Sequence, residues 1–460
     1  MKVDHSSPRS DVCIVISQPR AARRVRVGVA MMWAPANLAR LVAWFLALMD
    51  STCRAFVWRL ARRLPGDSRA PDALPEWWLG DDETPPVAIV TGAGSGIGRA
   101  TAKRLHTLGA RVAVVCATLE EAEETSARIA EEAEAAEAGA GPSSANLTRA
   151  VKRMTNRKKL PPPVAFGADL RDGAAVDALV RALDADYRTT PVGAVRCVVH
   201  CAGVMRCSFA RAKRSGLEET AAVNAAAPAR LTRSLLAARA DASPRGGTPR
   251  LRVVTVGSFT HRAVSAREMR RWVEWVDETR KQSPRSRRDA YVPATAYACS
   301  KTAATMFAYA LEDATARVSG ERNANRRGRR RRRDGARPPP PPSSALADPG
   351  LVDTAINREW PPALRLLYVL VARGLGVLAA PEDAAKTVCR ACFLPDDPRA
   401  SGSARRPRAS RGEVKKNKSE TPPFAYLFGA AGARLAPSRV VADAETREFC
   451  VRALERWAKL

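Results

Sequence analysis

The sequence has little of what marks several large classes of protein. Its ten cysteines are scattered among 460 residues, and only Cys389 and Cys392 form a CxxC pair, with no second Cys or His pair near it. That pattern is typical of free thiols in a reducing compartment, and it favours neither a disulfide scaffold nor a zinc site. We therefore expect no metal site.

Long hydrophobic runs are also missing. Residues 27–49 are apolar, but Pro35 and Arg40 interrupt them, so neither part reaches the ~20 residues that a membrane-spanning helix needs. Because arginines flank this run on both sides, three interpretations of residues 1–84 remain: a monotopic or signal anchor, an organellar transit peptide, or a helix that covers the following domain. The first two predict a membrane-associated protein on the reducing side of the endoplasmic reticulum or of an organelle such as the chloroplast.

Acidic residues are few compared with basic ones. The chain has 76 Lys and Arg against 47 Asp and Glu, a formal net charge of +29 that usually indicates a nucleic acid or an anionic membrane surface as partner. The excess lies in tails and inserts and leaves the remainder nearly neutral, so we expect no dedicated nucleic-acid-binding domain. The stretches concerned are residues 1–63, 143–160, 279–290, 320–342 and 399–418.

The rest of the chain alternates short apolar runs with longer helical patterns. Runs this apolar are typical of strands covered on both faces, and repeated strand–helix units predict an α/β fold with a Rossmann-like, doubly wound parallel sheet. The runs are 87–90, 111–117, 164–170, 195–203, 251–258 and 345–350. We expect one domain over 85–460, with disordered basic inserts near 138–163, 279–290, 320–344 and 398–420.

A glycine turn follows the first of these runs directly. The stretch TGAGSGIGRA, from Thr91 to Ala100, places Gly92, Gly96 and Gly98 at a turn between a strand and a helix. Missing side chains let the backbone approach a pyrophosphate, whose charge the helix N-terminus stabilises. In open sheets of this kind the ligand lies beyond the carboxyl ends of the strands, so the turn predicts a dinucleotide site there.

The spacing T-G-x-x-x-G-x-G resembles the short-chain dehydrogenase/reductase family, and further motifs follow in the family's order. Cys201-Ala202-Gly203 stands where the family has Asn-Ala-Gly, and a Pro-Gly motif begins at Pro349. The resemblance covers roughly residues 86–316 and resumes at 345. It implies cofactor contacts at Thr91, Gly92, Ser95, Gly96, Ile97, Gly98, Asp169, Leu170, Cys201, Ala202, Gly203, Tyr297, Lys301, Pro349, Gly350, Val352 and Thr354.

The same resemblance supplies a catalytic set. Tyr297 lies four residues before Lys301, one turn apart on a helix, so the lysine charge can favour the tyrosine phenolate and make it an acid/base for an alcohol or carbonyl oxygen. By resemblance, Lys301 also holds the nicotinamide ribose. Ser258 is expected to position the substrate oxygen, and Asn224 to hold a water in the proton relay.

Two departures from the family pattern affect these expectations. His200-Cys201 replaces the usual Asn-Asn, which removes an amide that ties the sheet together, and His200 is expected to be a structural residue at the end of its strand. Cys116-Ala117-Thr118, after the second strand, offers neither the acid that suits NAD nor the base that suits NADP. Because the acid is missing, we expect NADP slightly more than NAD, and Arg99 or a basic insert could assist its binding.

The later part of the chain resembles the retinol dehydrogenase-like branch, with an apolar segment from Ala363 to Ala380 that would either line or lid the substrate entrance or form a core helix. This implies an NAD(P)-dependent oxidoreductase that interconverts an alcohol and a carbonyl on a lipophilic small molecule, in contact with a membrane surface. A homo-oligomer is compatible with the sequence. The alternative is a catalytically weak dinucleotide-binding scaffold or sensor whose basic inserts bind anionic lipid or RNA.

Overall fold

The computed structural model describes most of the expected domain and one helix before it. The basic inserts fall largely outside the described residues, although helix α11 (Pro293–Gly328) and strand β6 (Ser343–Asp348) enter the range 320–344 from its two ends. The described residues are 35–62, 78, 85–139, 162–185, 192–242, 250–281, 291–328, 341–394, 425–429 and 432–460.

In this part of the chain, eight strands form one sheet in the order β10-β9-β6-β5-β4-β1-β2-β3. Every neighbouring pair is parallel except β9 with β10. The predicted doubly wound α/β fold is thus confirmed, with the order reversing between β1 and β4. The remaining strands are β1 (Val87–Thr91), β2 (Arg111–Cys116), β3 (Val164–Gly167), β4 (Val195–His200), β5 (Arg252–Val256), β9 (Ala425–Phe428) and β10 (Ala433–Arg434).

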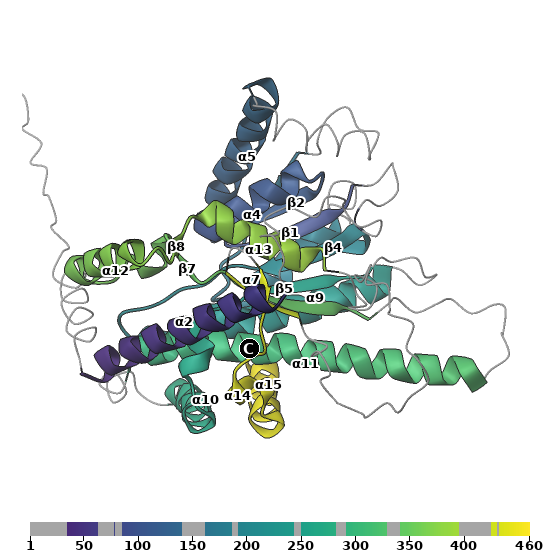
Figure 1. Cartoon of the computed structure of the whole chain (residues 1–460). Coiled ribbons are helices and arrows are strands. Elements are labelled where there is room, and N and C mark those ends of the chain that lie inside the picture. The colour runs from purple at the N-terminus through teal and green to yellow at the C-terminus, as the bar shows by residue number, and fades with distance from the viewer. Residues whose placement is uncertain are drawn as a thin grey trace, which may run out of the picture.

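Helices cover both faces of the sheet (Figure 1). Successive residues of β1 point to opposite faces, so Ala88 and Val90 join one core cluster while Val87 and Ile89 join another. The first cluster lies under α4 (Gly96–Thr107), α5 (Leu119–Gly139) and α13 (Pro381–Cys392). The opposite face is covered by α7 (Gly173–Ala185), α9 (Ala227–Ala242) and α11, with α10 (Ala266–Lys281) and α15 (Ala444–Trp457) farther out.

Helix α2 (Pro35–Arg62), from the N-terminal segment, packs against this domain. Its Trp44 and Leu48 are buried in the core, and Asn37 accepts a hydrogen bond from the backbone N–H of Ala294 at 3.0 Å. Arg40, which would be costly in a bilayer, forms an ion pair with Glu268 of α10. The described part of this segment, α2, thus covers the domain, while the anchor and transit-peptide interpretations of residues 1–84 stay predictions. Among the described helices, none combines the length and apolarity that crossing a membrane requires.

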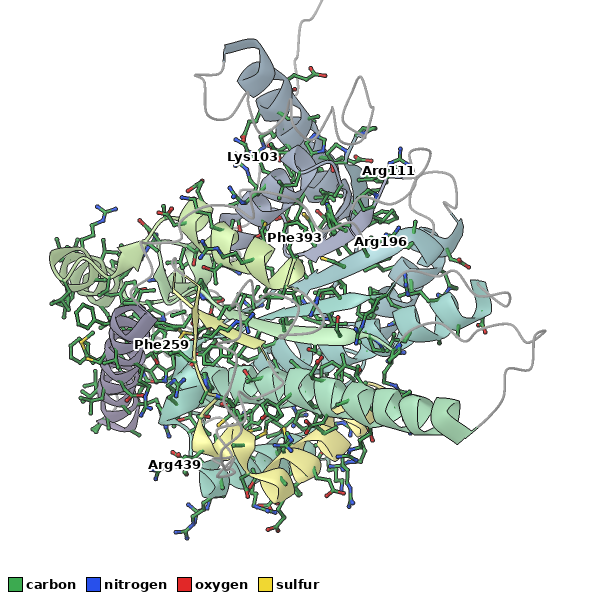
Figure 2. The ribbon with its side chains drawn as sticks, turned by 45° about the vertical axis from the view of Figure 1, so that its right-hand side comes forward. Lys103, Arg111, Arg196, Phe259, Phe393 and Arg439 are labelled. Carbon is green, nitrogen blue, oxygen red and sulfur yellow. The ribbon has the colours of Figure 1, made fainter. Side chains whose placement is uncertain are left out.

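Trp78 also belongs to the core, although the sequence places it in the segment before the fold. Its side chain is fully buried and meets the ring of Phe393 nearly edge-on at a centroid distance of 4.8 Å. The indole N–H donates to the carbonyl oxygen of Leu108 at 3.4 Å. Figure 2 labels Phe393, the residue directly after α13, so Trp78 packs at the C-terminal end of that helix.

We expect the substitution Trp78→Ala to lower the free energy of unfolding by about 3–5 kcal/mol, because it opens a cavity under α13. Trp78→Phe keeps an aromatic ring there and should lose markedly less. Chemical denaturation of the three proteins provides the measurement. Equal unfolding midpoints for Trp78→Ala and the parent would show that this contact does not hold the domain together.

Candidate active site

A cavity of about 450 Å³ lies at the carboxyl edge of the sheet. It extends from the glycine turn after β1, past the ends of β4 and β5, to the segment after β6. It therefore brings together residues from widely separated parts of the chain. The residues predicted from the sequence that line it are Gly92, Ser95, Gly96, Ile97, Gly98, Asp169, Leu170, Cys201, Ala202, Gly203, Ser258, Tyr297, Lys301, Pro349, Gly350, Val352 and Thr354.

The glycine turn is too tight for any other residue at two of its positions. Gly92 has φ +65°, and a Cβ atom there would lie 2.7 Å from the Cα of Ala202. A Cβ on Gly98 would overlap the carbonyl oxygen of Gly92. Helix α4 begins within this turn, at Gly96, so its N-terminus borders the cavity. A bare backbone beside a helix N-terminus fits the pyrophosphate of a dinucleotide.

Thr91 lies behind the cavity wall and not among its lining residues. Its hydroxyl accepts hydrogen bonds from the backbone N–H groups of Cys201 and Ala202, at 3.2 and 3.3 Å, and contacts the carbonyl oxygen of Val199 at 3.3 Å. The side chain is 1% exposed. Thr91 thus connects the ends of β1 and β4. The loss of the family's Asn was expected to weaken the sheet at this place.

His200 is a structural residue in this arrangement. Its Nε2 lies 2.8 Å from the hydroxyl of Thr232 on α9, and the ring is buried. Burial lowers the pKa of His200 to about 3, because a charged imidazolium would lose its hydration there. A histidine that stays neutral throughout the physiological range can anchor its strand but is a poor proton acceptor.

Tyr297 and Ser258 meet inside the cavity. The Ser258 hydroxyl accepts hydrogen bonds from the hydroxyl of Thr260 at 3.0 Å and from its backbone N–H at 3.4 Å, which leaves the serine proton free to be donated. Burial raises the pKa of Tyr297 above its usual value, while a hydrogen bond from Ser258 opposes that rise. The pair can therefore present a protonated phenol and a serine hydroxyl to one substrate oxygen.

Lys301 follows one turn after Tyr297 on α11 and also faces the cavity. Its ammonium group donates to the carbonyl oxygen of Val256 at 3.0 Å. Burial lowers the pKa of Lys301, and the nearby carboxylate of Asp348 opposes that shift. Asp348 itself accepts hydrogen bonds from the Tyr426 hydroxyl at 2.8 Å and from Gly350 N–H at 3.1 Å, and burial raises its pKa to about 6.

Asn224 stands beside the cavity on a π-helical turn, Ala222–Ala226. Its side chain bonds both backbone groups of Val204, at 2.8 and 2.9 Å, and donates to the Ser300 hydroxyl at 2.9 Å. A Cβ on Gly203 would lie 3.3 Å from the Lys301 ammonium and 3.4 Å from the Asn224 amide oxygen, so these groups flank one glycine. The predicted water relay between them stays a prediction.

The sequence did not predict the aromatic wall of the cavity. Trp44 of α2 packs at a centroid distance of 5.6 Å from Tyr297. Trp360, two residues before α12 (Pro362–Gly374), and Tyr368, within that helix, have ring centroids 5.5 Å apart. All three line the cavity. The spacing of Arg40, Trp44 and Leu48 along one helical face could have indicated that α2 packs on the domain, because residues four apart share a face.

The doubly wound sheet, the glycine turn and a tyrosine one turn from a lysine in one cavity define a nucleotide-dependent dehydrogenase of the Rossmann class. A family model described as short chain dehydrogenase matches residues 86–157. A polyprenol dehydrogenase from Mus musculus is 32% identical over 339 residues, which cover 74% of this chain and 78% of that relative. The chain therefore belongs to the short-chain dehydrogenase/reductase family, and it is an NAD(P)-dependent oxidoreductase.

Solved structures are similar to this chain over about two thirds of its length. A 3-ketoacyl-(acyl-carrier-protein) reductase from Brucella melitensis is 19% identical, covering 68% of this chain and 92% of its own, with a TM-score of 0.40. Salutaridine reductase from Papaver somniferum is 16% identical, covering 68% and 97%, with a TM-score of 0.41.

We expect Tyr297→Phe to reduce turnover about 10²–10⁴-fold, the usual contribution of a positioned acid/base. Binding of the reduced dinucleotide should change little, because the ring that packs against Trp44 is retained. Tyr309→Phe, on the same helix but outside the cavity, is the matched control and should turn over like the parent. Full activity in Tyr297→Phe would remove this residue from the chemistry.

Proposed function

We propose that this enzyme interconverts an alcohol and a carbonyl on a lipophilic substrate, such as the retinoid or steroid that the resemblance to the retinol dehydrogenase-like branch implies. The observation that carries the proposal is the apolar wall beside Tyr297. The polyprenol dehydrogenase from Mus musculus, by its name, acts on a long apolar alcohol, which supports the same class.

The wall comes from three separate parts of the chain. Trp44 is contributed by α2, Met205 by the segment after β4, and Trp360 by the segment before α12. Each of these side chains is at most 8% exposed. Apolar surface of this kind gains roughly 25 cal/mol for each Å² that a bound ligand removes from water, so it favours hydrocarbon over a hydrated polar group.

The residues around the substrate oxygen account for the proton steps. A bound nicotinamide supplies or accepts the hydride. In the reducing direction, Tyr297 donates its phenolic proton to the carbonyl oxygen, and Ser258 donates a hydrogen bond to that oxygen as charge develops on it. The ammonium of Lys301, one turn away, stabilises the phenolate that remains. In the oxidising direction the same phenolate removes the proton from the alcohol.

Trp44→Ala tests the wall. With a long apolar aldehyde delivered in cyclodextrin, we expect kcat/KM to fall at least ~10-fold through KM, since removing a buried aromatic contact weakens binding by roughly 1.5–3 kcal/mol. A small soluble aldehyde should be turned over nearly as before. Phe45 is the next residue of α2 and lies outside the cavity, so Phe45→Ala should leave kcat/KM unchanged for both aldehydes. An equal loss for both aldehydes would mean that Trp44 acts on the fold and not on the substrate.

We also propose that the enzyme rests on a membrane surface through α2 and α12. Both helices lie on the same side of the molecule in Figures 1 and 2, and their inner faces contribute Trp44 and Tyr368 to the cavity. Their outer faces expose large apolar side chains, which favours an interfacial position for the pair. Those residues are Val42, Phe45, Leu46, Phe56 and Val57 of α2, and Leu366, Leu367, Leu370, Val371 and Leu375 around α12.

Vesicle flotation tests this surface. The parent protein should float with neutral phosphatidylcholine vesicles, and the double variant Leu366→Asp with Leu370→Asp should lose most of the bound fraction. The double variant Leu119→Asp with Val318→Asp adds the same charge at exposed apolar positions on α5 and α11, and it should float like the parent. Equal flotation of both double variants would contradict the proposed surface.

A further inference from the structure

The adenosine end of the cavity holds a residue whose role neither the motifs nor the family assignment supplies. Here the cavity is lined by Gly94 and Ser95 of the glycine turn, Cys116 and Ala117 at the end of β2, and Glu121. In Rossmann dehydrogenases an acid at this place accepts the ribose hydroxyls of NAD, whereas a base binds the 2′-phosphate of NADP. The end of β2 itself offers neither, and the slight expectation of NADP rests only on the missing acid there.

Glu121 reaches this place from the first turn of α5. Its backbone N–H bonds the Thr118 hydroxyl at 3.2 Å, which fixes the start of the helix. Its side chain extends back across the turn, so closely that a Cβ atom on Gly94 would overlap the carboxylate. The same negative charge, after burial, contributes to raising the pKa of Cys116 to about 11. Two independent neighbours thus place the carboxylate between the glycine turn and the end of β2.

Three arginines that could receive a 2′-phosphate have acidic partners, whereas Arg358, which also lines the cavity, donates to the carbonyl oxygen of Ala355 at 3.4 Å. Arg99, which the sequence suggested for this role, bonds Glu132 of α5 at 2.5 Å. Among the lining residues described, Arg171 pairs with Asp169 at 2.7 Å. Arg206 is held between Glu219 and Glu359, each at 2.6 Å. No ion pair of the described residues involves Glu121, so its charge stays available to a ligand.

We propose that Glu121 selects NAD(H) over NADP(H) by accepting hydrogen bonds from the adenosine ribose hydroxyls and repelling the 2′-phosphate. A carboxylate and a phosphate at hydrogen-bond distance repel each other, while a hydroxyl donates to the carboxylate in a charge-assisted bond. The inference rests on the dinucleotide function of the cavity and is independent of the substrate class proposed above.

Equilibrium binding to the purified full chain tests the assignment without turnover. NADH and NADPH are titrated separately, and their nicotinamide fluorescence on binding is followed. We expect the parent to bind NADH at least ~10-fold more tightly than NADPH, a ratio that corresponds to about 1.4 kcal/mol. Glu121→Gln should weaken the binding of NADH and strengthen the binding of NADPH. The ratio of the two dissociation constants should then be close to one.

Glu120→Gln is the matched control, because Glu120 lies on the same turn of α5, is exposed and does not line the cavity. It should keep the parent's ratio. Equal or tighter binding of NADPH by the parent would overturn the role of Glu121, as would an unchanged ratio in Glu121→Gln. Failure of both dinucleotides to bind would overturn the cofactor assignment as well, whereas tight NADH binding without turnover of lipophilic carbonyls would count against the proposed substrate alone.

Discussion

The hydrogen bonds that Thr91 accepts from the backbone of Cys201 and Ala202 hold the switch point of the sheet together. They fix the ends of β1 and β4 at the place where the strand order reverses. The two backbones can come this close because residue 92 is a glycine, and a Cβ atom there would lie 2.7 Å from the Cα of Ala202. The glycine turn, α4 and the floor of the cavity all start from this junction. A threonine hydroxyl thereby does what the absent family amide was expected to do.

The catalytic groups depend on a second layer of contacts around that junction. Tyr297 is enclosed by Ser258, two residues after the end of β5, and by Trp44 from a helix that precedes the domain. The same α2 helix is fixed to α10 through Arg40 and Glu268, so its inner face belongs to the site while its outer face stays apolar and exposed. In the proposed account, one helix both completes the substrate cavity and meets the lipid from which the substrate comes.

Much of the fold could be predicted because parallel strands buried on both faces read as short apolar runs, and because a tight glycine turn leaves its own spacing in the sequence. The composition of α2 could not show what it packs against, since an apolar helix has the same composition whether it faces lipid or protein, and only the four-residue spacing of Arg40, Trp44 and Leu48 indicated a face for the domain. Trp78 had no periodic context around it. Glu121 gains its meaning only from its approach to Gly94 across a turn, and no spacing rule connects those two positions.

The central claim is that the dinucleotide, Tyr297 and a lipophilic carbonyl meet in one cavity. Transfer of deuterium tests it most directly: the purified chain is incubated with nicotinamide dinucleotide carrying deuteride and a long apolar aldehyde, and the alcohol is analysed by mass spectrometry. The account predicts an alcohol with one deuterium on its carbinol carbon from the parent and almost none from Tyr297→Phe. An alcohol without deuterium, or equal deuterium from both proteins, would contradict it.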